Sequence, residues 1–246
     1  MFANLELLDA IGRFQMKNDD ILVVSFPKSG TTWVQEIVTQ ILALQSTIST
    51  DRHSNIEDRF PYIEYPYPGL KSLKDRPSPR LLKSHLPYWF MPQSVSNNVG
   101  KVIYIARQPK DVCVSYYNFL KMISFLNYSG SFQNFFQNFL EGTVAYGPWI
   151  DHVTSFWEHR NDPNILFITY EDLHSNSPKV IKRIADFLGT VLTDQQINEI
   201  AKETKFEKMK DNPSVNYSWW DDLGIRNKKE ANFMRKGLVR NFFFIF

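Results

Sequence analysis

Residues 21–45 read ILVVSFPKSGTTWVQEIVTQILALQ. The first six residues are mostly apolar and rich in β-branched side chains, which predicts a buried strand at 21–26. Residues 31–45 repeat their apolar side chains at helical spacing, and one face would be formed by Trp33, Val34, Ile37, Val38, Ile41 and Leu42. A short loop that contains Gly30 joins the two runs. This stretch therefore predicts a strand, a tight loop and a helix in direct succession.

The same alternation continues along the chain. Three more short runs predict strands: RLLKS at 80–84, KVIYIA at 101–106 and NILFITY at 164–170. Strands separated by helical patterns are typical of a parallel sheet that is covered on both faces. The sequence therefore predicts an α/β fold, as a single domain over residues 1–246 with a mainly parallel sheet flanked by helices.

Three further helices are expected from their end signals. One covers residues 109–126 and starts with Pro109, which suits a first helical turn. A second runs over 177–188 and is closed by a glycine. A third begins after Thr193, whose spacing to Gln196 has the form of a capping box.

Polar residues follow the predicted strands where a parallel sheet binds its ligands. Lys28 and Ser29 follow the first strand, Arg107 follows the third, and Tyr170 ends the fourth. In open α/β sheets, ligands lie outside the carboxyl ends of the strands. We therefore expect these side chains to converge on one site.

The loop itself has the chemistry of an anion site. Its glycine lets backbone N–H groups turn into one concavity, the helix N-terminus adds a partial positive charge, and Lys28 adds a full one. Thr31 and Thr32 add hydroxyl donors. The loop resembles a P-loop but is not a Walker A sequence, because Lys28 precedes Gly30 instead of following it. This order disfavours a P-loop kinase or NTPase, and a plain tight turn is the simpler alternative.

Composition excludes several classes of protein. The chain has 246 residues, 43% hydrophobic and 22% charged, with a net charge of +2, so no broad basic field exists for nucleic acid. Its apolar runs are too short to span a bilayer, and its first residues lack the pattern of a signal peptide. The single cysteine, Cys113, cannot form an intrachain disulfide. We therefore expect a cytoplasmic protein with no nucleic-acid or membrane partner.

Six segments together resemble one known family. They are FPKSGTTW at 26–33, LLKSHLP at 81–87, ARQPKDVCVSYYNF at 106–119, TYED at 169–172, TKFEKMKDNP at 204–213 and FMRKG at 233–237. In this order they are similar to the cytosolic sulfotransferases, which transfer a sulfonate group from 3′-phosphoadenylyl sulfate (PAPS) to small acceptors. The resemblance implies that the first segment is a loop for the 5′-phosphosulfate.

The resemblance implies three catalytic residues. His85 would be the general base, and Lys28 and Lys83 would stabilise the transferring group. The residues themselves are compatible with these roles, because neutral imidazole accepts a proton near pH ~6.5 and residues 83 and 85 share a face of a strand. Taken alone, His85 would more simply be a structural histidine at a strand end.

The resemblance also implies the residues that bind the donor. The 5′-phosphosulfate would be held by Lys28, Ser29, Gly30, Thr31, Thr32 and Trp33, and the 3′-phosphate by Arg107, Ser115, Arg235, Lys236 and Gly237. Trp33 and Phe206 would stack on adenine, with Tyr170, Thr204 and Met209 nearby. Simpler alternatives remain: Trp33 and Met209 could be core residues, and Arg235 and Lys236 a solvated charge pair. No metal is expected, since these cations can supply the positive charge.

For the acceptor, the resemblance implies a pocket lined by Tyr62, Tyr65 and Phe119 together with Lys83 and His85. Residues 217–224 would contribute to a lid. Aromatic residues make up 15% of the chain, and such side chains line pockets for flat apolar molecules. The expected acceptor is a phenol, an alcohol, a sterol or an amine.

Relative to the family pattern, the chain is shorter at both ends. FMRKG is followed by LVRNFFFIF and the end of the sequence, so the region after about residue 237 is atypical. The family's homodimer motif is absent, which favours a monomer. A second hypothesis follows, namely a non-catalytic, truncated isoform that retains nucleotide binding.

Overall fold

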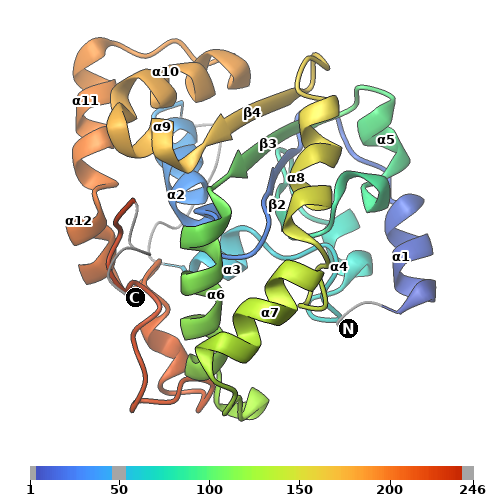
Figure 1. Cartoon of the computed structure of the whole chain (residues 1–246). Coiled ribbons are helices and arrows are strands. Elements are labelled where there is room, and N and C mark those ends of the chain that lie inside the picture. The colour runs from blue at the N-terminus through green and yellow to red at the C-terminus, as the bar shows by residue number, and fades with distance from the viewer. Residues whose placement is uncertain (1–3, 46–53, 240–246) are drawn as a thin grey trace.

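The computed structural model describes residues 4–45 and 54–239, so the NFFFIF stretch at the C-terminus lies outside the described residues. Its centre is a four-stranded parallel sheet with the strand order β2-β1-β3-β4. The strands are β1 Ile21–Val24, β2 Leu81–Ser84, β3 Lys101–Ala106 and β4 Ile165–Thr169. All neighbouring strands pair in parallel, and helices lie on both sides of the sheet (Figure 1). The predicted α/β class and parallel sheet are confirmed.

The helices expected from the sequence are present, although α2 and α6 end earlier than expected. They are α2 Thr31–Ala43, α6 Pro109–Met122, α10 Ser177–Leu188 and α11 Asp194–Glu203. The capping box of α11 forms as predicted, with the Thr193 side chain accepting from the N–H of Gln196. The first strand ends at Val24, before the loop, and Tyr170 begins a helix instead of ending β4.

Further elements were not expected from the sequence. The helices are α1 Leu5–Gly12, α3 Ile56–Arg59, α4 Leu70–Lys74, α5 Gln93–Ser96, α7 Phe132–Glu141, α8 Trp149–Glu158, α9 Tyr170–Ser175 and α12 Phe206–Asp211. Three 3₁₀ turns add η1 Tyr88–Phe90, η2 Ser124–Leu126 and η3 Ser218–Trp220. Several of these helices have only four to six residues, too few to show a helical period in the sequence.

The sheet is buried on both faces, which explains why its strands are almost continuously apolar. Ile21 and Val23 of β1 pack into one core with α2, α10 and α11. Leu22 and Val24 point to the other core, which includes residues of α1 and α8. Figure 1 shows these two sets of helices on opposite sides of the sheet.

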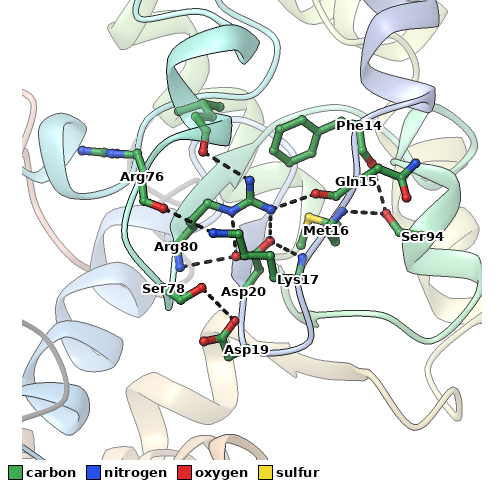
Figure 2. Close-up of polar contacts among 11 residues, drawn as sticks. Phe14, Gln15, Met16, Lys17, Asp19, Asp20, Arg76, Ser78, Arg80 and Ser94 are labelled. Atoms are coloured by element: carbon green, nitrogen blue, oxygen red, sulfur yellow. Dashed lines mark hydrogen bonds and ion pairs between the residues drawn. The ribbon is translucent and has the colours of Figure 1, made fainter.

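A buried ion pair fixes the N-terminal entry to the sheet (Figure 2). Arg80 and Asp20 are 2% and 0% exposed, and the Arg80 Nε atom donates to Asp20 Oδ1 over 2.8 Å. The remaining Arg80 donors bind the carbonyl oxygens of Gln15 at 2.8 Å and Leu73 at 3.2 Å. Asp20 Oδ2 accepts from the backbone N–H of Lys17 over 2.7 Å. The pair therefore joins the segments that precede β1 and β2, at the opposite end of these strands from the loop between β1 and α2.

Replacing Arg80 by methionine is expected to destabilise the fold by about 3–5 kcal/mol, because it leaves the Asp20 carboxylate buried without its charge partner. Urea unfolding would measure the loss. Lys182→Met is the control, since the Lys182–Asp186 pair is exposed (60% and 58%) and contributes little. Equal losses in the two variants would contradict this role of the buried pair.

Candidate active site

A cavity of about 1590 Å³ lies beyond the carboxyl ends of the strands. Of the residues that the sequence predicted for the site, all except Ser29 line this cavity: Lys28, Gly30, Thr31, Thr32, Trp33, Tyr62, Tyr65, Lys83, His85, Arg107, Ser115, Phe119, Tyr170, Thr204, Phe206, Met209, Arg235, Lys236 and Gly237. The Ser29 side chain is fully buried and takes no part in the lining. The fold thus brings together residues from the whole length of the chain.

The loop between β1 and α2 is a tight turn with two residues in the left-handed region. Lys28 has φ +70° and Gly30 has φ +110°. A Cβ atom at position 30 would lie 2.8 Å from Cδ2 of Tyr170, so only glycine allows this close approach. No side chain caps α2, so its first backbone N–H groups stay available to an anion at the cavity.

Lys28 lies between two aromatic rings. Its Nζ atom is 3.8 Å from the ring centroid of Phe233 and 4.5 Å from that of Phe119. Burial, together with the smaller effect of the positive charges of Arg107 and Arg235, lowers the pKa of Lys28 to about 7. A ligand anion here would therefore favour the protonated form of the lysine.

Arg107 connects the third strand to the C-terminal segment. Its guanidinium lies 4.1 Å above the ring of Tyr170 and donates to the carbonyl oxygens of Lys28 at 3.3 Å and Leu238 at 2.9 Å. The Nε atom is buried and has no hydrogen-bond partner among the described residues. Arg235 is close enough for the two positive charges to lower its pKa, after the larger effect of burial. This concentration of positive charge suits a phosphate group.

Hydrogen bonds fix the tautomer of His85. Its Nδ1 atom lies 2.8 Å from the carbonyl oxygen of Ser25, which can only accept, so Nδ1 carries the proton. The Nε2 atom therefore has a free lone pair, which accepts from the hydroxyl of Tyr62 over 3.2 Å. Burial lowers the pKa of His85 to about 3, so the ring is neutral. This is the state that a general base needs.

Two buried side chains hold the backbone of His85 in place. Glu64 Oε1 accepts from its N–H over 2.7 Å, and His152 Nε2 donates to its carbonyl oxygen over 2.9 Å. His152 Nδ1 in turn accepts from the hydroxyl of Tyr104 over 2.9 Å. Glu64 and His152 are 0% and 1% exposed. The position of the His85 ring is thus set by contacts on both sides of its peptide.

Lys83 is 1% exposed, although it carries a charge. Its Nζ atom lies 3.5 Å from Glu57 Oε1, 3.3 Å from the hydroxyl of Tyr217 and 3.9 Å from the ring centroid of Tyr62. Burial lowers the pKa of Lys83, and Glu57 partly opposes this shift. The ammonium group is therefore placed beside Tyr62, and Tyr62 binds His85.

Aromatic side chains of α2, α9 and α12 also line the cavity. The rings of Trp33 and Tyr170 are in edge contact at 5.4 Å. Gly237 lies against Phe206, where a Cβ atom would be only 2.3 Å from the ring, so a larger residue would displace Phe206. Thr204 donates its hydroxyl to the carbonyl of Ile200 at 2.8 Å. Met209 belongs to the core as well as the lining, so its packing role is present.

The aromatic pocket near His85 is built from Tyr62 and Tyr65, whose rings stack at 3.9 Å. Tyr217 stacks on Trp219 at 4.8 Å and contacts Phe233 at 4.0 Å, and Tyr217, Trp219, Trp220 and Leu223 of the 217–224 segment line the cavity.

Some site residues were missed from the sequence. Glu57, Glu64, Tyr146 and His152 lie at or directly beneath the cavity, and none was predicted. Their contacts join residues 21 to 67 positions apart, so no local spacing could signal them. Glu64 and His152 could only have been noted as polar residues in otherwise apolar surroundings.

Two features are absent from residues 4–45 and 54–239. No helix there is long and apolar enough to cross a membrane. No group of three or more His, Cys, Asp or Glu side chains is arranged to hold a metal ion.

The sequence matches a family described as "Sulfotransferase domain" over residues 18–243. It is 37% identical to a rabbit (Oryctolagus cuniculus) amine sulfotransferase over 238 residues, which is 96% of this chain and 78% of that protein. It is 40% identical to mouse (Mus musculus) sulfotransferase 1B1 over 243 residues, 96% of this chain and 81% of that protein.

Solved structures with the same fold contain a nucleotide. A retinol dehydratase in complex with androsterone and the inactive cofactor PAP has a TM-score of 0.88 and 30% identity, over 98% of this chain and 80% of that one. Mouse sulfotransferase SULT7A1 complexed with PAP has a TM-score of 0.79 and 32% identity, over 100% of this chain and 84% of that one.

Proposed function

The chain belongs to the sulfotransferase family and is a PAPS-dependent enzyme, and we propose that it transfers the sulfonate to a hydroxyl or amine of a small, aromatic or otherwise apolar acceptor. His85 is the general base in this proposal. Lys28 and Lys83 stabilise the transferring group. PAPS supplies the sulfonate and leaves as adenosine 3′,5′-bisphosphate (PAP).

The residues present fit such a donor. The loop from Lys28 to Thr32 offers backbone N–H groups and two hydroxyls at the start of α2, beside a lysine. Arg107 holds a buried Nε atom that lacks a partner among the residues described, and Arg235 and Lys236 line the same part of the cavity. A ligand with two separate phosphate groups would neutralise these charges.

The proton of the acceptor goes to His85 in this mechanism. The Nε2 lone pair faces Tyr62 at the cavity, and the bond from Nδ1–H to Ser25 keeps the ring from flipping. When Nε2 takes the proton, the imidazolium still donates through Nδ1 to the same carbonyl oxygen. The fixed, neutral His85 is the single observation that best supports sulfonate transfer at this site.

Lys28 and Lys83 have different roles in this mechanism. Lys28 lies in the loop for the 5′-phosphosulfate, where it would stabilise charge on the departing phosphate. Lys83 lies on β2 two residues before the base, and its ammonium group would contact the sulfonate oxygens. Its present partners, Glu57 and Tyr217, are long contacts of 3.5 and 3.3 Å that a sulfonate could replace.

The acceptor is proposed from the lining alone. Tyr62, Tyr65 and Phe119 present ring faces, which favour flat apolar molecules with one polar group. Phenols, alcohols, sterols and amines all satisfy this description. We also propose a cytoplasmic location, because the single cysteine, Cys113, is buried and unpaired.

The test is transfer of labelled sulfonate from PAPS to a panel of phenols, sterols, alkyl alcohols and amines, with and without EDTA. We expect product with at least one flat apolar acceptor, at the same rate in EDTA. Absence of transfer to every acceptor would overturn the proposal. Loss of activity in EDTA that magnesium restores would contradict charge stabilisation by the lysines and arginines.

The donor site is expected to bind PAP at least tenfold more tightly than AMP. A charged hydrogen bond to a phosphate contributes about 1.5–3 kcal/mol, and the 3′-phosphate would gain more than one from Arg107, Ser115, Arg235 and Lys236. Calorimetry with both nucleotides would measure the ratio, and equal affinities would contradict the site.

Arg107→Ala should reduce PAP affinity more than Arg235→Ala. Arg107 is anchored at the end of β3 and also binds the carbonyl of Leu238, so its loss removes a phosphate ligand and loosens the segment that carries Arg235. AMP affinity, measured in both variants, is the control and should fall less than PAP affinity, because AMP lacks the 3′-phosphate. A larger loss in Arg235→Ala would contradict this order.

A further inference from the structure

Tyr62 is fixed to the strand that carries the proposed catalytic residues. Tyr62 forms a parallel β-bridge with Lys83. The N–H of Lys83 donates to the carbonyl of Pro61 over 3.0 Å, and the N–H of Ile63 donates to the carbonyl of Lys83 over 3.1 Å. The backbone of Tyr62 is therefore held on both sides, next to the residue proposed to contact the sulfonate.

The Tyr62 ring is held as well. One face stacks on Tyr65, with centroids 3.9 Å apart and planes at 19°. The Lys83 ammonium lies 3.9 Å from the ring centroid. Burial raises the pKa of Tyr62, so its hydroxyl is protonated and donates to His85 Nε2 over 3.2 Å.

The phenol group of Tyr62 thus has the contacts that the mechanism requires of an acceptor. An acceptor hydroxyl must donate to the Nε2 lone pair of His85 and lie beside the ammonium of Lys83. The Tyr62 hydroxyl makes the first contact, and the Lys83 ammonium lies over the ring that carries this hydroxyl. Phenols are also one of the proposed acceptor classes.

On the basis of the proposed function, we propose that Tyr62 is itself a sulfonate acceptor, so that the enzyme sulfonates its own active site when no other acceptor is bound. The Tyr62 Oη atom forms a bond to the sulfur of PAPS while the bond from sulfur to the 5′-phosphate oxygen breaks. His85 Nε2 takes the phenol proton. The products are one tyrosine O-sulfate and one PAP per chain.

Sulfonation of Tyr62 would stop further turnover. The product can no longer donate to His85, and its anionic group would pair with Lys83 inside the acceptor pocket. A bound acceptor competes for the same base, so it should protect Tyr62. The reaction is therefore limited to one event per chain, and it is fastest in the absence of acceptor.

The test is the mass of the intact chain after incubation with PAPS alone at neutral pH. We expect a gain of one SO₃ group per chain, mapped to Tyr62 by peptide sequencing, and no gain in Tyr62→Phe or His85→Ala. Tyr128→Phe is the matched control, because it removes a phenol that does not line the cavity, and this variant should still gain the group at Tyr62. A group mapped to any other residue would overturn the proposal.

The same preparation is also given PAPS and 2-naphthol. Transfer to naphthol with an unmodified Tyr62 in the acceptor-free sample would overturn self-sulfonation and leave the proposed function intact. Transfer to neither would overturn both. Naphthol should also slow the gain in mass of the chain in proportion to its occupancy of the pocket.

A second measurement needs no donor. If the Tyr62 hydroxyl occupies the acceptor's place at His85, naphthol must displace its hydrogen bond in order to bind. Tyr62→Phe should therefore bind naphthol about 3- to 10-fold more tightly, the range expected for one neutral hydrogen bond. Calorimetry without nucleotide would measure this affinity. Unchanged affinity would mean that Tyr62 does not hold this place, and the proposal would fail.

Discussion

Replacing His85 by alanine is expected to lower kcat by about 10²–10⁴-fold, the usual contribution of a positioned general base. PAP affinity should stay within about twofold, because no described contact of His85 reaches the donor loop beyond Ser25. The acceptor KM should change less than kcat. Steady-state kinetics with PAPS and the best acceptor, together with PAP calorimetry, would measure all three.

The pH profile provides a second measurement for His85. Its pKa is lowered to about 3 by burial, so the ring stays neutral from pH 5 to 8 and should add no acidic limb near 6.5. His159→Ala is the control, because His159 is paired with Asp162 and stacked on Tyr88 away from the cavity. A variant at His85 that keeps most of its turnover would contradict the assignment, and a limb near 6.5 that His85→Ala removes would contradict the lowered pKa of His85.

Replacing Lys28 by methionine is expected to lower kcat by about 10²–10³-fold, as for the loss of one preorganised group that stabilises charge in the transition state. Lys28 is the cation of the loop, and burial between Phe119 and Phe233 gives its charge little competition from water. Methionine keeps most of the length and apolar contact of the side chain. Single-turnover transfer from PAPS would measure the loss.

Lys28 should also link PAP binding to pH. Its pKa is about 7 in the free protein, and a bound phosphate raises it. The contribution of the charged lysine to affinity is therefore fully present below pH 7 and declines as pH rises above 7. Calorimetry at pH 8 in buffers of different ionisation enthalpy should detect proton uptake on PAP binding.

Lys28→Met should abolish this uptake, whereas Lys182→Met, on the exposed face of α10, should keep it. Identical proton uptake in the wild type and in Lys28→Met would show that another group accounts for the linkage. Unchanged turnover in Lys28→Met would separately remove the lysine from the mechanism.

Much of the fold could be predicted from local patterns. The four apolar runs became the four parallel strands, and the capping signal at Thr193 became the start of α11. The strand–loop–helix unit at 21–45 was recognisable because strand and helix have different apolar periods, and these are properties of neighbouring residues. The sequence predicts Tyr170 as the last residue of a strand, whereas it is the first residue of α9. A strand that passes directly into a helix leaves no sharp signal in the sequence.

The candidate site residues were also predicted, but as segments and not as an arrangement. The motifs carrying Lys28, His85 and Arg107 follow β1, β2 and β3, and the parallel sheet brings the ends of these strands to one edge. The sequence alone therefore determined the strands, the anion loop and the types of residue at the site.

Only the tertiary structure decided how these residues are arranged and which partners they contact. The carbonyl of Ser25, 60 residues away in the sequence, holds the proton of His85 on Nδ1. Tyr217, 134 residues from Lys83, lies beside the Lys83 ammonium. The tertiary structure also brings the hydroxyl of Tyr62 to Nε2 of His85. Tautomer, pKa and hydrogen-bond partner depend on burial and on contacts between distant segments. Local spacing carries no information about these contacts until the chain has packed.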